Sequence, residues 1–412
     1  MKKNKITSDK LLIFLFFLLV CFGWMNIFST TYSGAFNINA NYGRQLMWIG
    51  ISCVSALFLS FLNSQFFRNI TLPLYIITVI LVFLTAFIGK KTNGATSWLG
   101  IGSFGIQPAE FAKYATCLFM AHFLSNPNHT LYNRKNIWLS ILILIIPICC
   151  ILLQNDTGSA IPFVFLVFVM IREGLTLWVL GTGFLLILLL ILSILVQQWI
   201  ILLCITLIFG FLFFRMRKHK KYYLGLFLAY AFTVIYVFSI HTVYDKVLKD
   251  YQKERIELVL GRTHDTKGIG YNVNQSKIAI GSGGLLGQGF MKGTQTTMNF
   301  VPEQSTDFIF CTVGEEWGFV GSTLLILTYT LLIFRIIKRA EEQRDNFIRI
   351  YGYCIACIFF SHLMINIGMT LGLLPVIGIP LPFISYGGSS LIAYTFMLFT
   401  FIAMDAKTNS WG

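Results

Sequence analysis

The chain has 412 residues, of which 56% are hydrophobic and only 12% are charged, and its 31 Lys and Arg against 17 Asp and Glu give a formal net charge of +14. Soluble domains contain about 25% charged residues, so this composition excludes a disordered chain, a disulfide scaffold and an ordinary water-soluble enzyme. A chain this apolar needs lipid as its solvent. We therefore interpret the positive charge through membrane topology, and we expect no nucleic-acid partner.

Apolar segments long enough to cross a membrane follow one another along the whole chain. A transmembrane helix needs about 20 mostly apolar residues. Twelve segments are predicted as spans: 11–32, 45–64, 70–89, 107–125, 136–153, 157–172, 174–196, 198–214, 222–243, 307–336, 347–374 and 383–404. The segment 157–172 is short, and the pair within 174–214 is separated only by a short polar break. The predicted fold is an all-α polytopic integral membrane protein with 10–12 transmembrane helices, forming a single domain over 1–412.

The distribution of Lys and Arg predicts the orientation of these helices. Positive charge favours cytoplasmic loops, and the basic cluster 215–221 fits an inner hairpin. The short outer segments contain only Arg44, Lys90 and Lys91. Both termini are therefore expected in the cytoplasm. No small-residue cleavage site follows the basic start of the chain, so the first apolar segment is interpreted as a retained helix.

The nine cysteines lie in or beside apolar segments. None of them forms a pattern in a polar loop, so no disulfide bond is expected. Cys354 and Cys357 have the spacing of a redox or metal pair. Inside an apolar segment, however, two such residues are interpreted as small side chains that pack between helices.

Ionisable residues interrupt the apolar pattern on one side of the membrane. Such groups are unfavourable at membrane depth and are functional candidates by default. Glu110 and Lys113 share a helix face at an outer end, and Asp156 and Asp307 lie at the outer edge of other spans, whereas the inner half has almost no comparable group. A structural ion pair and two helix N-caps are the alternative interpretation. The convergence of these charges favours a shared polar cavity.

A loop of about 60 residues, 244–306, connects two spans on the outer side and is much longer than usual connections. Residues 247–260 have an amphipathic period and predict a helix on the outer surface, with a plain solvated helix as the alternative. Residues 274–279 predict a second short helix. The glycine run 281–289 lacks the G-x-G-x-x-G and Walker A spacings, so a nucleotide site is poorly supported. We interpret it as a flexible loop through which backbone approaches a substrate.

Two irregular segments meet the membrane on the same outer side. A turn at Pro302 brings four polar side chains to the membrane edge: Glu303, Gln304, Thr306 and Asp307. Prolines break the backbone within 378–390, where the hydroxyl groups include Ser385 and Ser389. Irregular backbone at this depth is tolerated only if it is buried or lines a cavity.

Four motifs in these regions resemble those of one membrane protein family. They are NGATSWLG at 93–100 with QPAEFAK at 107–113, QNDTG at 154–158, VPEQSTDFIF at 301–310 with GEEWG at 314–318, and PLPFISYGGSS at 380–390. In this order they resemble the SEDS family (shape, elongation, division and sporulation) of RodA, FtsW and SpoVE. The segment 293–302 is more similar to the RodA branch. Family members usually have ten spans, and their usual His before Thr-Asp is Ser305 here.

The resemblance implies a peptidoglycan glycosyltransferase for cell elongation and shape. Its members polymerise lipid II at the outer face of the bacterial cytoplasmic membrane. The implied partners are lipid II and the polyprenyl-pyrophosphate-linked glycan, a class B penicillin-binding protein transpeptidase, and other membrane proteins of the elongation complex. Family members carry an essential aspartate in the large extracellular loop, which Asp307 matches.

This chemistry assigns expected roles to the polar residues. A carboxylate must take the proton of the acceptor hydroxyl, and Asp307 is the expected general base. Positive charge must hold the leaving pyrophosphate, for which Lys113, Arg255 and, more weakly, Arg44 are candidates. The remaining substrate-binding candidates are Glu110, Asp156, Glu303, Gln304, Ser385 and Ser389. A divalent cation, Mg²⁺ or Mn²⁺, could assist, but no cluster of ligands with metal spacing identifies one, so no cofactor is assigned.

A lipid II flippase is the alternative function, because a polar cavity could also hold a headgroup during transport. A flippase needs a polar route across the whole bilayer and often has internal repeats. Neither a repeat nor a charge path through the inner half is evident in the sequence. A channel is disfavoured by the same one-sided distribution of polar groups.

Overall fold

The computed structural model describes residues 9–32, 34–92, 94–101, 104–218, 220–246, 253, 257 and 269–408. The chain divides into two compact units, one made of 1–175 with 271–412 and the other of 176–270. Within the described part, ten helices are long and apolar enough to cross a membrane. The predicted all-α polytopic fold is confirmed. These helices are α1 (Lys10–Thr31), α2 (Asn41–Phe61), α3 (Ser64–Ile88), α5 (Arg134–Leu153), α8 (Trp178–Leu195), α9 (Gln198–Arg215), α10 (Tyr223–Lys246), α14 (Ile309–Glu341), α15 (Asn346–Thr370) and α16 (Gly388–Thr408).

The two other predicted spans are shorter or more polar helices. The segment 107–125 forms α4 (Pro108–Ser125), which carries Glu110 and Lys113. The segment 157–172 forms α6 (Thr157–Val164) and α7 (Val167–Arg172). Between them the N–H groups of Phe165 and Leu166 donate to carbonyls three residues earlier, so a tight turn interrupts the helix. The pair predicted within 174–214 is two helices, α8 and α9, as expected.

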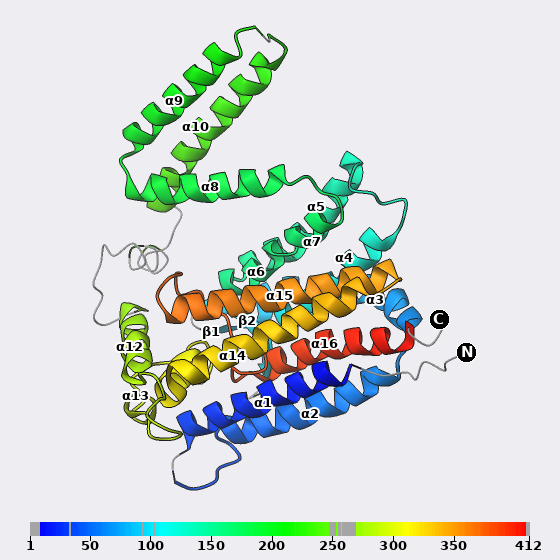
Figure 1. The fold of residues 1–412 in the computed structure, drawn as a ribbon, viewed down its shortest axis with the longest axis vertical. Helices are drawn as coiled ribbons and strands as arrows, with labels where there is room; N and C mark the ends of the chain where they lie inside the picture. Colours follow the sequence, from blue (N-terminus) through cyan, green and yellow to red (C-terminus); the bar gives the residue numbers. More distant parts are fainter. Residues whose placement is uncertain are drawn as a thin grey trace. The chain divides into compact units, whose positions relative to one another are not determined.

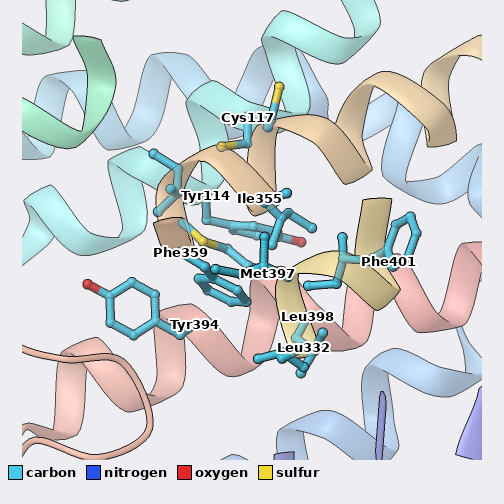
Figure 2. Packing of buried hydrophobic residues seen from close by; sticks show 14 of the residues in the cluster. Tyr114, Cys117, Leu332, Ile355, Phe359, Tyr394, Met397, Leu398 and Phe401 are labelled. Atoms are coloured by element: carbon cyan, nitrogen blue, oxygen red, sulfur yellow. The ribbon is translucent and has the colours of Figure 1, made fainter. Parts of the chain in front are cut away.

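The core of the larger unit lies between α4, α14, α15 and α16. In Figure 1, α14 and α15 run side by side, and the two helices are in contact. Figure 2 shows the packing at the centre, where Tyr114 of α4, Ile355 and Phe359 of α15, and Met397 of α16 converge. In the apolar 18-residue stretches of α15 and α16, 78% and 83% of the residues are buried by protein, against 22% in that of α2. The central helices therefore meet protein on most sides, and α2 presents its apolar side chains outward.

Buried charges also lie at the end of the larger unit where α1 begins and α16 ends. Asp9 caps α1 by accepting from the N–H groups of Leu11 and Leu12. It also pairs with Arg335 at 2.7 Å, and Arg339 pairs with Asp405 at 2.7 Å. Because these groups neutralise one another at helix ends, they join α1, α14 and α16.

A small antiparallel sheet precedes α4, and the sequence analysis did not predict it. Its strands are β1 (Lys90–Thr92), β2 (Ala95–Ile101) and β3 (Phe104–Ile106), in the order β1-β2-β3. The N–H of Thr96 donates to the carbonyl of Gln154 at 2.9 Å, which ties the sheet to the end of α5. The sheet therefore fixes where Gln107 and the first turn of α4 begin.

The long loop contains two helices in its described part. The helix predicted at 274–279 is confirmed and is longer, forming α12 (Ile269–Ser282). A single turn, α13 (Thr294–Thr297), follows. The helix predicted at 247–260 falls almost entirely outside the described residues.

The glycine run 281–289 packs against a break in α14. At Gly318 the backbone has φ +64° and ψ −161°, which interrupts the helix. The N–H of Gln288 donates to the carbonyl of Glu315, and the N–H of Phe319 donates to the carbonyl of Gly284, both at 2.9 Å. The glycines therefore permit a close backbone approach to α14.

We expect Gly318→Ala to lower the free energy of unfolding by about 3 kcal/mol, because only glycine adopts this backbone conformation readily and because a Cβ there would overlap the backbone N of Gly287. Thermal unfolding of the purified protein in detergent measures the change. Gly210→Ala in α9 is the control, since no atom lies within 4 Å of its added Cβ. Equal stability of the two variants would show that the break in α14 is not required.

Candidate functional site

Two loops meet at the end of the larger unit where α14 begins. We name residues 303–308 the aspartate loop and residues 378–387 the proline loop. The N–H of Tyr386 donates to the carbonyl of Ser305 at 2.8 Å. The hydroxyl of Ser385 donates to the carbonyl of Thr306 at 2.7 Å and accepts from the N–H of Leu381 at 2.8 Å. The two loops therefore form one hydrogen-bonded structure before α14 and α16.

Asp307 is half-buried between these loops. Its backbone carbonyl accepts from Asn366 Nδ2 at 2.8 Å, and the same amide donates to the carbonyl of Ile379 at 2.8 Å. A Cβ at Gly378 would lie 3.1 Å from Asp307 Oδ2, so this carboxylate oxygen faces the backbone of the proline loop. The N-cap of α14 is Phe308, with no side-chain cap hydrogen bond. Asp307 is therefore not the helix cap that the alternative interpretation required.

Glu110 and Lys113 form a buried ion pair on α4. Lys113 Nζ lies 2.8 Å from Glu110 Oε1, 3.1 Å from His362 Nε2 and 3.2 Å from the Tyr394 hydroxyl. All four side chains are at most 2% exposed. The three donors of the ammonium are thus occupied within the protein, and contact with a leaving group would require this cluster to open. The geometry therefore favours a structural role for this ion pair.

Asp156 caps α6, as the alternative interpretation expected. One carboxylate oxygen accepts from the N–H of Ser159 at 3.1 Å, and the other accepts from the Ser159 hydroxyl at 2.9 Å and from Gln107 Nε2 at 3.0 Å. The N–H of Gln107 in turn donates to Ser389 Oγ at 3.2 Å. Asp156 is therefore connected through Gln107 to the first turn of α16.

The turn α13 is held from both sides by buried side chains. The Glu315 carboxylate accepts from the N–H groups of Gln295 at 2.8 Å and Thr296 at 2.9 Å. Gln304 Nε2 donates to the carbonyl of Thr296 at 2.9 Å and to Asn299 Oδ1 at 2.7 Å. Gln304 therefore supports the loop that carries Asp307.

The other predicted site residues are distributed around the two loops. Glu303 is exposed and accepts from the hydroxyl of Thr306 at 2.8 Å. Arg44 is partly exposed on the first turn of α2, where Asn41 donates to Ser305 Oγ and Gln45 accepts from the N–H of Gly387, both at 3.3 Å. Arg44 thus lies on a helical turn that touches both loops. Arg255 falls outside the described residues.

Four residues at the site are not predicted from the sequence: His362, Asn366, Tyr394 and Gln45. His362 and Asn366 stand four residues apart on α15, so both face the proline loop. A signal for His362 was present, because an ionisable residue inside an apolar span is a functional candidate by default. Glutamine and tyrosine give no such signal, and only the contacts of Gln45 and Tyr394 identify them.

Among the residues that the structure describes, no three His, Cys, Asp or Glu side chains come together as ligands of a metal ion. Glu110 is paired with Lys113, and both oxygens of Asp156 and of Glu315 accept hydrogen bonds. Glu110 Oε1 and the carboxylates of Asp156 and Glu315 are therefore engaged by protein donors, and we derive no step through a divalent cation.

An apolar pocket of about 320 Å³ lies beside the start of α4. It is lined by Thr78, Leu81, Leu99, Gly100, Ile106, Pro108 and Phe111. Pro108 directly follows Gln107, so the pocket adjoins the polar contacts of Gln107 with Asp156 and Ser389. An apolar space next to polar groups suits a molecule with a polar head and a hydrocarbon chain.

Comparison with known proteins identifies relatives that belong to one family. A family model described as cell cycle protein, covering FtsW, RodA and SpoVE, matches residues 9–207 and 201–410. A peptidoglycan glycosyltransferase RodA of Treponema pallidum is 31% identical, with 97% of this chain and 98% of that protein covered. The peptidoglycan glycosyltransferase MrdB of Escherichia coli K12 is 33% identical, with 77% and 73% covered.

Solved structures share the fold. A chain from a peptidoglycan synthase complex, reported for its structural coordination of polymerization and crosslinking, has a TM-score of 0.69 at 25% identity, with 98% of both chains covered. The rod shape determining protein RodA of Thermus thermophilus has a TM-score of 0.64 at 22% identity, again with 98% of both chains covered. The similarity thus extends over nearly the whole chain.

Proposed function

Because the chain belongs to the cell cycle protein family of FtsW, RodA and SpoVE, we infer that it is a multi-pass membrane peptidoglycan glycosyltransferase. The observation that carries this inference is the similarity to a peptidoglycan glycosyltransferase RodA over 97% of this chain and 98% of that relative. We propose further that it polymerises lipid II at the outer face of the cytoplasmic membrane, with both termini in the cytoplasm. The concentration of Lys and Arg in the inner segments supports this orientation.

Asp307 is the proposed general base of this reaction. The 4-hydroxyl of the acceptor sugar gives its proton to the carboxylate while its oxygen bonds to the anomeric carbon of the donor. The bond from that carbon to the phosphate oxygen breaks, and polyprenyl pyrophosphate leaves with the electron pair. A positioned base accelerates such a step by about 10²–10⁴. Support comes from the half-buried Asp307 side chain, which is held between two loops that are hydrogen-bonded to each other.

The leaving pyrophosphate needs nearby positive charge. Arg44 is the proposed ligand, since it is partly exposed on a turn of α2 that touches both loops, and Arg255 of the long loop remains a second candidate. Lys113 is proposed to support the site without contacting the pyrophosphate. The N–H donors of its ammonium are already occupied by Glu110, His362 and Tyr394. Asp156, Gln304, Ser385 and Ser389 are likewise engaged in holding the site together.

The hydrocarbon chain of a lipid-linked substrate is proposed to use the apolar pocket at the start of α4. That pocket is lined by residues such as Leu81, Leu99 and Phe111. A transpeptidase of the class B penicillin-binding type is the proposed partner. Support for it is the similarity to a chain of a peptidoglycan synthase complex in which polymerization and crosslinking are coordinated.

The test of the function is polymerisation of labelled lipid II by the purified protein, resolved on gels, with and without its transpeptidase partner. We expect glycan strands from the wild-type protein. A translocation assay in vesicles is run with the same preparation. Translocation of lipid II without any polymer, even with the partner present, would favour the flippase and overturn the transferase.

We expect Gly378→Ala to reduce the rate of polymerisation about tenfold or more. Gly378 has φ +79°, and its added Cβ would press on Asp307 Oδ2. The carboxylate must give way by a few tenths of an ångström, and the left-handed backbone at this position adds strain, so the reacting group is misplaced. Initial rates measure the effect. Gly34→Ala is the matched control, because Gly34 also has a positive φ, +95°, but no atom lies within 4 Å of its added Cβ. Equal polymerisation rates for both variants would show that Gly378 has no effect on the reaction.

A further inference from the structure

His362 is a fully buried residue of α15 that the reaction described above does not use. Its Nε2 atom lies 3.1 Å from Lys113 Nζ, and its Nδ1 atom lies 2.9 Å from the carbonyl oxygen of Pro380. The imidazole therefore bridges α4 and the proline loop. Because it has no exposed surface, its effect on a reaction must pass through the groups that it touches.

The two contacts of His362 define its tautomer. A lysine ammonium only donates hydrogen bonds, so the Nε2 atom facing Lys113 must accept. A carbonyl only accepts, so the Nδ1 atom facing Pro380 must carry the proton. The hydroxyl of Tyr394 lies 3.1 Å from the same nitrogen. Lys113, whose charge Glu110 balances, thus selects the neutral imidazole protonated on Nδ1.

This tautomer holds the proline loop at the position where it meets the aspartate. His362 donates to the carbonyl of Pro380, and Asn366, one turn further along α15, donates to the carbonyls of Ile379 and Asp307. At the preceding residue, Gly378, an added Cβ would lie 3.1 Å from Asp307 Oδ2, so this carboxylate faces the loop backbone there. One face of α15 therefore fixes the backbone on both sides of this carboxylate.

We propose that His362 is a positioning residue for the glycosyl transfer: held in its Nδ1-protonated tautomer by Lys113, it fixes the proline loop against the Asp307 carboxylate. The proposal rests on the proposed role of Asp307 as general base. A base displaced by about 1 Å loses rate, while substrate contacts made elsewhere persist. Loss of the hydrogen bond to Pro380 therefore lowers kcat and changes KM little.

Two amide substitutions separate the two contacts of His362. In His362→Asn the amide nitrogen occupies the place of Nδ1 and can donate to Pro380, whereas in His362→Gln the longer amide reaches the place of Nε2 and can accept from Lys113. We expect His362→Asn to keep kcat within about threefold of wild type. We expect His362→Gln and His362→Leu to lose about tenfold or more in kcat, with KM for lipid II changed less than about threefold.

Ser361→Ala is the matched control for these variants. Ser361 is a fully buried neighbour on α15, and its hydroxyl donates to the carbonyl of Ile358 in its own helix at 2.7 Å. We expect its kinetics to match the wild type. If His362→Gln were as active as His362→Asn, the contact with Lys113 would be sufficient and the positioning proposal would be overturned.

The tautomer is measured without reference to activity. Solid-state NMR of the protein labelled with ¹⁵N and ¹³C histidine distinguishes a ring protonated on Nδ1 from one protonated on Nε2, and the spectrum of His362→Asn identifies the signal of His362. We expect protonation on Nδ1 alone, and protonation on Nε2 or on both nitrogens would contradict the proposal. Activity of Asp307→Asn tests the base separately, so an inactive Asp307→Asn beside a fully active His362→Leu would overturn only this inference.

Discussion

Asp307→Asn is expected to abolish detectable polymerisation of lipid II while leaving its binding largely unchanged. The substitution keeps the size of the side chain and its place between the two loops, but an amide cannot take a proton from the acceptor hydroxyl. Loss of a positioned general base lowers the rate by about 10²–10⁴. Gel-resolved polymerisation gives the rate, and titration with labelled lipid II gives the affinity. An equal fall in both quantities would assign Asp307 to binding instead.

Glu303→Gln is the matched control for this substitution. Glu303 lies in the same loop and also accepts a hydrogen bond, from the hydroxyl of Thr306, but its side chain is exposed. We expect Glu303→Gln to lower the rate much less than Asp307→Asn does, because a substrate-binding side chain does not have to take the proton. Polymer formed by Asp307→Asn at the wild-type rate would remove Asp307 as the base and leave the enzyme class intact. Glu110 and Asp156 would then be the candidate general bases, and their present hydrogen bonds would have to break before either could act.

Lys113→Met is expected to lower the free energy of unfolding by about 3–5 kcal/mol. Removing one partner of a buried ion pair leaves the other charge uncompensated, and here the Glu110 carboxylate is 2% exposed. The double variant Glu110→Gln with Lys113→Met removes both charges at similar volume. We expect it to recover most of the lost stability. Thermal unfolding in detergent compares the single and double variants.

Lys91→Ala serves as the control for loss of a lysine, since Lys91 is exposed on β1. It is expected to change stability by less than about 0.5 kcal/mol. A Lys113→Met variant that unfolds like the wild type, and that loses use of the donor substrate selectively, would contradict the structural role. That result would indicate direct contact between Lys113 and the leaving pyrophosphate.

Membrane class and helix positions follow from the sequence because hydropathy is a local property. Even the break between α8 and α9 is readable from a short polar interruption in an apolar stretch. Asp307 was selected by its motif and by its place at the end of the long loop. The capping role of Asp156 follows from local spacing as well, since its partner Ser159 is only three residues away.

The tertiary structure decided which polar residues meet. Lys113 and His362 are 249 positions apart, and although each is an ionisable residue inside its own apolar segment, only the packing of α4 against α15 shows that the two meet. The glycine run packs against α14, and a sequence by itself does not indicate which backbone a glycine will face. Hydrogen-bond partners between distant segments depend on helix packing, and hydropathy and spacing carry no information about that packing.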